Sequence, residues 1–331
     1  MASQRVTMRQ VAAEAGVASM TVSYTYTRPD RVAPDTRARV LAAAQRLGYA
    51  GPDPVARSLR RGATGNLGVV MGEHLSYAFE DPQAARFLAG VSSVCVEKRL
   101  GLVLIPSTGD PEDVDRVREA AVDGFVLWTT DESDAVLDAV AATGRPAAIQ
   151  GGPTVPGISV VSPDDRGAAR AMAFHMLAGA ASPLILSMPL DRGRRAGLHR
   201  GPDTSVSFPV TRARLEGYRD AAEEAGRPWQ DMPVAVVARH SRNDARLAIE
   251  DALAHVRPDV VIAMSDQLAA GAVDVLGSSA LVSGWDDSEL ARALGFSSVS
   301  QSLYDQGVAC ARIASGTMTT VESPTWNLAL R

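Results

Sequence analysis

Several short apolar runs of this chain end in residues that can hydrogen-bond to a small molecule or stack on it. Trp128, Gln150, Ser265-Asp266 and Trp285-Asp286 follow such runs, and residues 72–77, which end in Tyr77, follow an earlier one. Ligands of open α/β sheets bind outside the carboxyl ends of parallel strands. The pattern therefore predicts a ligand cleft at these positions.

The runs themselves form two sets, which are separated by stretches with helical spacing. The first set is 67–71, 102–105, 125–128 and 147–150, and the second is 184–188, 234–238, 260–264 and 281–285. Apolar runs of this length that alternate with amphipathic stretches are typical of buried parallel strands joined by helices. We expect an α/β domain of two doubly wound parallel-sheet lobes.

The first fifty residues carry a different pattern. Thr7 and Gln10 form a capping box before a short helix that ends at Gly16, and a third helix is predicted from Pro34 to the stop at Gly48. Its apolar positions, expected to face inward, are Val40, Leu41, Ala44 and Leu47. Residues 19–26 lie between these helices, and their β-branched and aromatic content favours a strand.

The spacing nevertheless favours a helix over 19–26. A helix, a tight turn with glycine, and a second segment with exposed Ser, Thr and Tyr make the helix-turn-helix pattern, in which the second helix enters the major groove. Ten arginines against Glu14, Asp30, Asp35 and Asp53 give residues 1–65 a charge of +6, whereas the whole chain carries −5. We expect an all-α DNA-binding domain there.

Signals for an enzyme are absent from the sequence. Lys98 is the single lysine, so no phosphate-binding G-x-x-x-x-G-K-[ST] loop exists, and neither G-x-G-x-x-G after a strand nor G-x-S-x-G occurs. The five histidines have no metal-ligand spacing, and Cys95 and Cys310 suit reduced core positions. We expect no enzyme, cofactor or metal. No export signal or membrane span is evident, which indicates a cytoplasmic protein.

Three segments together resemble the LacI/GalR family of bacterial repressors: VTMRQVAAEAGVASMTVS, RVAPDTRARVLAAAQRLGY and VARSLRRG. The resemblance implies that the second helix reads the major groove and that a hinge helix enters the minor groove of a two-fold operator. Ser19, Met20 and Thr21 then take base-reading positions, and Leu59 wedges a base step open beside the small Ala56. Candidate phosphate contacts are Thr7, Ser23, Arg31, Thr36, Arg57 and Arg60. Tyr24, also a DNA-binding candidate, stands where many members have arginine.

The remainder resembles the family's effector domain, which is similar to a periplasmic sugar-binding protein. TRARLEGY, AMSDQLAAGA and VSGWDDSE resemble effector-holding segments and imply roles for Arg214, Ser265, Asp266 and Asp286. Other interpretations stay open: a salt bridge for Arg214, helix caps for Asp266 and Asp286, and core lids rather than sugar-stacking rings for Trp128 and Trp285. Residues 192–205, rich in arginine, form either a solvated loop or a second nucleic-acid patch.

These expectations give a domain plan: DNA-binding domain 1–50, hinge 51–63 and effector domain 64–331. The N-terminal lobe would hold 64–160 and 292–323, and the C-terminal lobe 161–291 and 324–331, with crossovers near 158–163, 288–297 and 322–326. No heptad tail follows the last predicted strand, which favours a homodimer. A stripe at Phe87, Val91 and Val94 faces either the partner subunit or the lobe's own sheet.

The resemblance implies a transcriptional regulator, a repressor that binds a palindromic operator as a dimer under the control of a small molecule, most commonly a sugar. Two alternatives belong to other classes. One is a solute-binding module without a regulatory role, and the other is an α/β enzyme with a fused DNA-binding domain.

Overall fold

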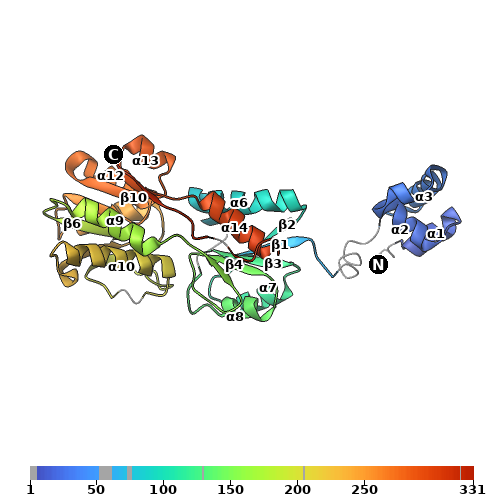
Figure 1. The fold of residues 1–331 in the computed structure, drawn as a ribbon, viewed down its shortest axis with the longest axis horizontal. Coiled ribbons are helices and arrows are strands. Elements are labelled where there is room, and N and C mark those ends of the chain that lie inside the picture. Colours follow the sequence, from blue (N-terminus) through green and yellow to red (C-terminus); the bar gives the residue numbers. More distant parts are fainter. Residues whose placement is uncertain (1–5, 52–61, 73–76, 129, 204–205, 321) are drawn as a thin grey trace. The chain divides into compact units, whose positions relative to one another are not determined.

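The computed structural model describes residues 6–51, 62–72, 77–128, 130–203, 206–320 and 322–331. The chain forms two compact units, Met1–Thr64 and Gly65–Arg331, which Figure 1 draws as a small helical unit and a larger α/β unit. Within the described residues no helix is long and apolar enough to cross a lipid bilayer.

The small unit, called the reader unit below, has three helices, α1 (Met8–Ala15), α2 (Ser19–Thr27) and α3 (Pro34–Leu47), with a 3₁₀ turn η1 (Pro29–Arg31) before α3. The capping box of Thr7 and Gln10 is confirmed, and Gly16 and Gly48 end α1 and α3 in the left-handed conformation. Residues 19–26 are helical as the spacing predicted, so packing overrides their strand propensity.

A core of small apolar side chains holds these helices together: Val11, Ala12, Val22, Val40, Ala43 and Ala44. The prediction that Leu41 faces inward is wrong, because Leu41 is 40% exposed while Ala43 is fully buried. The inward face of α3 runs over Val40, Ala43 and Ala44, with Leu47 packed beside them, so Leu41 falls outside this face. Tyr26 and Tyr49 meet edge to face at 6.0 Å beside this core.

The N-terminal lobe of the larger unit is built on a five-stranded parallel sheet in the order β2-β1-β3-β4-β5. Its strands are β1 (Asn66–Met71), β2 (Gly101–Pro106), β3 (Gly124–Trp128), β4 (Ala147–Gln150) and β5 (Ser159–Val161). Helices α6 (Pro82–Lys98) and α14 (Leu303–Ala314) cover one face, and α7 (Glu112–Glu119) and α8 (Ala135–Ala142) cover the other (Figure 1). The short α5 (Tyr77–Glu80) precedes α6.

The C-terminal lobe has a seven-stranded sheet in the order β12-β11-β10-β9-β6-β8-β7, antiparallel only at its edge strands β7 and β12. Its strands are β6 (Pro183–Ser187), β7 (Gly197–Arg200), β8 (Pro233–Val236), β9 (Val260–Ala263), β10 (Leu281–Trp285), β11 (Ser297–Ser300) and β12 (Asn327–Ala329). Its helices are α9 (Asp165–Leu177), α10 (Pro209–Glu224), α11 (Arg242–Ala252), α12 (Asp266–Leu276) and α13 (Glu289–Leu294).

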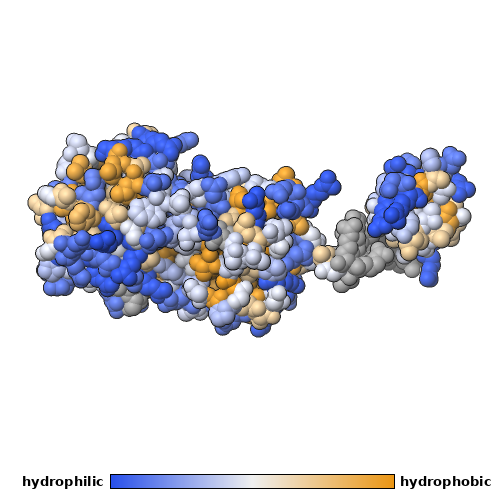
Figure 2. Space-filling model, in the orientation of Figure 1, coloured by the Kyte–Doolittle hydropathy of each residue, from blue (hydrophilic) through white to orange (hydrophobic). Residues whose placement is uncertain are grey.

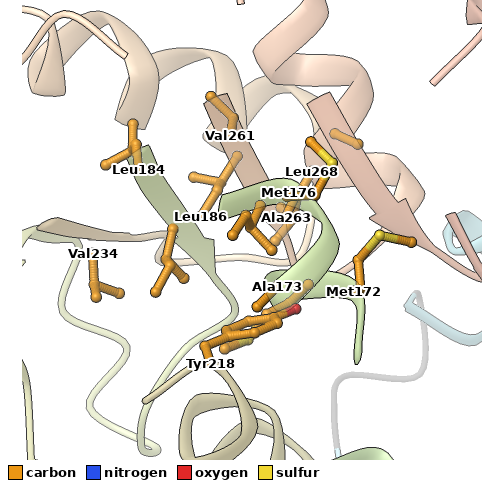
Figure 3. Close-up of a cluster of buried hydrophobic side chains, with 14 of the residues drawn as sticks. Met172, Ala173, Met176, Leu184, Leu186, Tyr218, Val234, Val261, Ala263 and Leu268 are labelled. Carbon is orange, nitrogen blue, oxygen red and sulfur yellow. The ribbon is translucent and has the colours of Figure 1, made fainter. Parts of the chain in front are cut away.

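The core of this lobe is a single apolar cluster between the sheet and its helices. Figure 3 shows part of this cluster, in which Met172 and Met176 of α9 and Tyr218 of α10 are labelled together with Leu184 and Leu186 of β6. The outer faces of α9 and α10 carry ion pairs, Arg166 with Asp220 and Arg170 with Glu224, and the surface there is strongly hydrophilic in Figure 2. The two sides of each helix therefore follow the amphipathic spacing of the sequence.

The crossover expected near 288–297 is wrong. β11 pairs with β10 and β12, and α13 packs on α12, so residues up to Ser300 belong to the C-terminal lobe and the chain returns to the other lobe only at α14. The sequence prediction missed this because a four-residue strand rich in serine carries little apolar signal.

The stripe on α6 does not form an outer surface. Phe87, Val91 and Val94 are buried in the core of their own lobe, between the sheet and α14. A Cβ on Gly307 would lie 2.2 Å from the Phe87 carbonyl oxygen, so the two helices touch through this glycine. Of the two interpretations of the stripe, the dimer contact is wrong and the internal packing is confirmed. Cys95 and Cys310 are buried free thiols in the same cluster.

Candidate functional site

The outer side of α2 presents the side chains predicted to read bases. Met20 is 61% exposed, Ser19 is exposed, and Thr21, Ser23 and Tyr24 are half-buried at its edges. The hydroxyls of Thr25 and Thr27 donate to the carbonyl oxygens of Thr21 and Ser23 one turn earlier, so they are occupied within the helix. Ser19 and Met20 are the most exposed of the three side chains predicted to read bases.

The predicted phosphate contacts have mixed surroundings. Arg31 is exposed and Thr36 is half-buried in the first turn of α3. Thr7 is exposed, but its hydroxyl is engaged in the capping box with Gln10. The candidates Ala56, Arg57, Leu59 and Arg60 lie outside the described residues, as does the side chain of Tyr77.

A cleft of ≈ 840 Å³, open mouth included, lies between the two lobes of the larger unit. Five of the predicted effector residues line it: Trp128, Gln150, Arg214, Ser265 and Asp286. Trp285 and Asp266 do not line it. The carboxyl ends of strands from both sheets therefore meet at one cleft, as expected for parallel sheets.

Two polar atoms on the N-terminal wall of the cleft have no hydrogen-bond partner among the described residues. They are Nε1 of Trp128 and Oγ1 of Thr130, and both side chains are at least 95% buried. The Trp128 ring packs against Phe87, with centroids 4.4 Å apart. Buried donors without a partner cost free energy, so both atoms would gain if a rearrangement of this wall brought them to an acceptor.

Arg214 reaches the cleft from α10 and is 6% exposed. Its guanidinium donates to Asp165 at 2.9 Å and to the Met264 carbonyl, and its Cζ lies 3.7 Å from the centroid of the Trp285 ring. The salt bridge that the sequence left open is therefore present. Trp285 is fully buried beneath this guanidinium, so it supports Arg214 and cannot stack on a ligand.

Asp266 and Asp286 both follow strands, but Asp266 bonds to neighbouring segments whereas Asp286 faces the cleft. The Asp266 carboxylate accepts from the Ser288 backbone and hydroxyl and from Ser298, each at 2.7 Å, so it ties α12 to the strand ends. Ser265, not Asp266, caps α12. Asp286 has φ 112°, faces the cleft and accepts from Gln301 at 2.8 Å. Burial, with the charge of Asp266, raises the pKa of Asp286 to about 8.

The sequence analysis missed two residues that join the lobes across the cleft. His240, which follows β8, lies with Nδ1 3.1 Å from Oδ2 of Asp81, the N-cap of α6, and with Nε2 2.6 Å from Oγ of Ser265. The two residues are 159 positions apart, so no local signal links them. His240 follows a strand at its carboxyl end, and that position was the available clue.

A chain of amides crosses from one lobe to the other beside these residues. Gln150 Nε2 donates to Gln306, Gln306 Nε2 donates to Gln301, each at 3.0 Å, and Gln301 donates to Asp286. Gln306 is buried on α14, and Gln301 lies in the segment where the chain passes between lobes. Gln150 thus belongs to a hydrogen-bonded chain that ends at Asp286.

Residues 192–205 were expected to be a solvated loop or a nucleic-acid patch. Instead, Arg192 binds Asp134 of the other lobe, Arg194 lines the cleft, and Gly197–Arg200 forms edge strand β7. Ser207 donates to Asp131, and Arg212 pairs with Glu132 at 2.7 Å. Arg192 and the neighbouring Arg212 thus pair with acidic residues of the other lobe of the same chain.

Comparison with known proteins supports the architecture. Residues 7–51 match the family described as bacterial regulatory proteins of the lacI family, and residues 99–322 match the periplasmic binding proteins and sugar binding domain of the LacI family. The chain belongs to the LacI family. An HTH-type transcriptional regulator of Mycolicibacterium smegmatis is 36% identical over 324 residues, which cover 92% of this chain and 88% of that protein.

A second relative and a solved structure agree with this assignment, the first in sequence and the second in fold. The ribose operon repressor of Escherichia coli is 30% identical over 300 residues, which cover 86% of this chain and 84% of that protein. A structure of the lac repressor dimer bound to operator and the anti-inducer ONPF has a TM-score of 0.73 at 20% identity and covers 98% of both chains. The HTH unit and the two periplasmic-binding-protein-like lobes are thus those of the LacI family.

Proposed function

We propose that this LacI-family regulator acts in the cytoplasm as a repressor that binds a palindromic operator as a homodimer, and that a carbohydrate in the interlobe cleft changes its affinity for DNA. The observation that carries the proposal is the joint presence, in one chain, of an open α2 face and a cleft lined by polar and aromatic side chains from both lobes.

For DNA, we assign base reading to Ser19, Met20 and Thr21 because these residues lie at the start of α2. The N-terminal residues of a recognition helix contact base edges in this motif. Ser23, Tyr24, Arg31 and Thr36 flank that position and suit sugar-phosphate contacts. Thr7 can join them through its backbone N–H only if the capping box opens. Ala56, Arg57, Leu59 and Arg60 keep the roles that the family resemblance implies, in the hinge 51–63.

For the effector, we assign Trp128, Gln150, Arg214, Ser265 and Asp286 to the cleft wall and add Thr130 and His240. An indole N–H, a hydroxyl and a guanidinium supply donors, and the amide and carboxyl groups supply acceptors. Two charged side chains of the cleft wall have partners of opposite charge: Arg214 pairs with Asp165, and His240 pairs with Asp81 when it is protonated. An uncharged ligand with several hydroxyls suits such a lining. The name of the related ribose operon repressor supports both the carbohydrate and the repression.

The test is selection of duplexes from a random pool by the purified chain, followed by sequencing of the retained DNA. A palindromic site would support the regulator and the dimer, and a steep fall of affinity with salt would follow from phosphate contacts. Leu59→Ala should weaken the selected site, whereas Leu247→Ala, at an exposed leucine of α11, should not. Enrichment of no duplex at moderate salt would overturn the proposal.

A further inference from the structure

Among the side-chain contacts that join the two lobes, the one between His240 and Asp81 includes a group that titrates near neutrality. We propose that His240 and Asp81 form a proton-dependent clamp that favours closed lobes. The consequence for regulation rests on the proposed effector role of the cleft, but the clamp itself does not. His240 belongs to the C-terminal lobe and Asp81 to the N-terminal lobe, so the contact exists only while the lobes are together.

The geometry of the clamp suits both protonation states of the ring. The neutral imidazole can donate from Nδ1 to Asp81 while Nε2 accepts from the Ser265 hydroxyl, whose oxygen also caps α12 at Leu268. Protonation makes both ring nitrogens donors and adds a charge attraction to Asp81. The side chains of His240 and Asp81 are 13% and 3% exposed, so water screens this attraction little.

The charges around His240 favour its cationic form. Asp81 from α6 faces it as a carboxylate, whereas Asp286 after β10, with a pKa of about 8, is protonated at neutral pH. Arg214 of α10 opposes the cationic form, but Asp165 already pairs this arginine. On the segment of His240 itself, the exposed Arg239 pairs with Asp244. Burial lowers the pKa of His240, but the hydrogen bond and the charge of Asp81 raise it above its ordinary value of 6.5.

The direction of the pH effect follows from linkage. Opening the lobes separates His240 from Asp81, and its pKa then returns toward the ordinary range. The closed lobes therefore bind the proton more tightly, so closure is favoured fully below 6.5 and loses this contribution as the pH rises through the raised pKa. An effector that is enclosed by the closed lobes would bind more tightly on the acid side.

The first experiment measures the pKa of His240 by NMR in the full chain with labelled histidine, with His240→Gln to assign the signal. We expect a pKa above 6.5 that drops by roughly one unit or more in Asp81→Asn, because burial then acts unopposed by the nearest charge. Asp115→Asn, at an exposed aspartate of the same lobe, serves as the matched control and should leave it unchanged. If the pKa of His240 is the same in Asp81→Asn as in the wild type, the clamp is overturned.

The second experiment measures the distance between the lobes in a chain labelled at Glu119→Cys and Asp251→Cys, both exposed sites. Cys95 and Cys310 are buried, so the labels go to the new thiols. Asp286, with a pKa of about 8, would titrate in the same range, so the measurement is made in an Asp286→Asn background. We expect longer distances at about pH 8.5 than at about pH 5.5 there, and no such change once His240→Gln is added. Equal distances at both pH values overturn the proposal. Neither experiment needs DNA or effector, so failure of the proposed function would be seen separately.

Discussion

The two units of this chain differ in where they keep their functional groups. The reader unit places Met20 and Ser19 on an open helix face above a core of six small side chains. The larger unit places Arg214, Trp128 and Asp286 in or beside buried hydrogen-bond networks. Substitutions on the open face should therefore change recognition without changing stability, whereas substitutions in the cleft should change both.

The strongest expected effect comes from Arg214→Met. This change leaves the Asp165 carboxylate buried without its cation and uncovers Trp285, so the larger unit should lose about 3–5 kcal/mol of unfolding free energy. Denaturant unfolding would measure the loss. Adding Asp165→Asn should return part of it, because the lone buried charge is removed; a single variant as stable as the wild type would contradict the network.

A smaller effect on stability is expected at two neighbouring aspartates, Asp286 and Asp287, whose contributions depend on pH in opposite directions. The raised pKa of Asp286, about 8 because of burial and the charge of Asp266, means that the folded chain holds a proton that the unfolded chain releases above about 3.8. Its contribution to stability therefore falls as the pH rises from about 4 to about 8. Asp286→Asn should flatten that slope, which unfolding curves at several pH values would show.

Asp287 is the matched control for Asp286. Burial alone would raise its pKa, but Arg331 and Arg292 outweigh burial and lower it below 3.8. Its contribution is present above 3.8 and lost as the pH falls through the lowered pKa. Asp287→Asn should therefore cost stability at neutral pH, where Asp286→Asn does not. Identical pH profiles for the two variants would contradict these assignments.

A loss of about 1 kcal/mol is expected from Thr7→Ala, which removes the capping box of α1. If the two units unfold separately, calorimetry should show a lower transition for the reader unit alone. Ser302→Ala removes the corresponding cap of α14 and should lower the other transition instead. A shift of both transitions by either variant would show that the units are not independent.

The smallest effect on stability is expected from Met20→Ala, within about 0.5 kcal/mol, because the side chain is 61% exposed. The same variant should alter the sequences that the protein selects from a random pool. Unchanged selection would remove Met20 from the base-reading set.

Local patterns in the sequence were sufficient for most of the fold. The capping box at Thr7 and the spacing of 19–26 predicted α1 and α2, and the apolar runs predicted the central strands of both sheets. β11 was not predicted because Ser297–Ser300 carries little apolar signal. Leu41 was misplaced because the face of α3 that is buried depends on how all three helices pack.

The cleft was predictable as a position but not as a network. The carboxyl ends of strands located Gln150, Ser265 and Asp286, because parallel topology brings such ends together. The partners of these residues come from distant segments: Asp81 for His240, Asp165 for Arg214, and Gln306 for Gln150. Which strand-end residues face the ligand and which support their neighbours, as Trp285 does, depends on those long-range contacts.

The most direct test of the account is the affinity of the selected operator duplex measured with and without a carbohydrate that raises the thermal transition of the larger unit. Such a ligand should change operator affinity by about fivefold or more in the wild type. It should neither bind nor alter operator affinity in Arg214→Met examined under conditions where that variant is folded. A ligand that stabilises the larger unit but leaves operator affinity unchanged would contradict the link between cleft and reader.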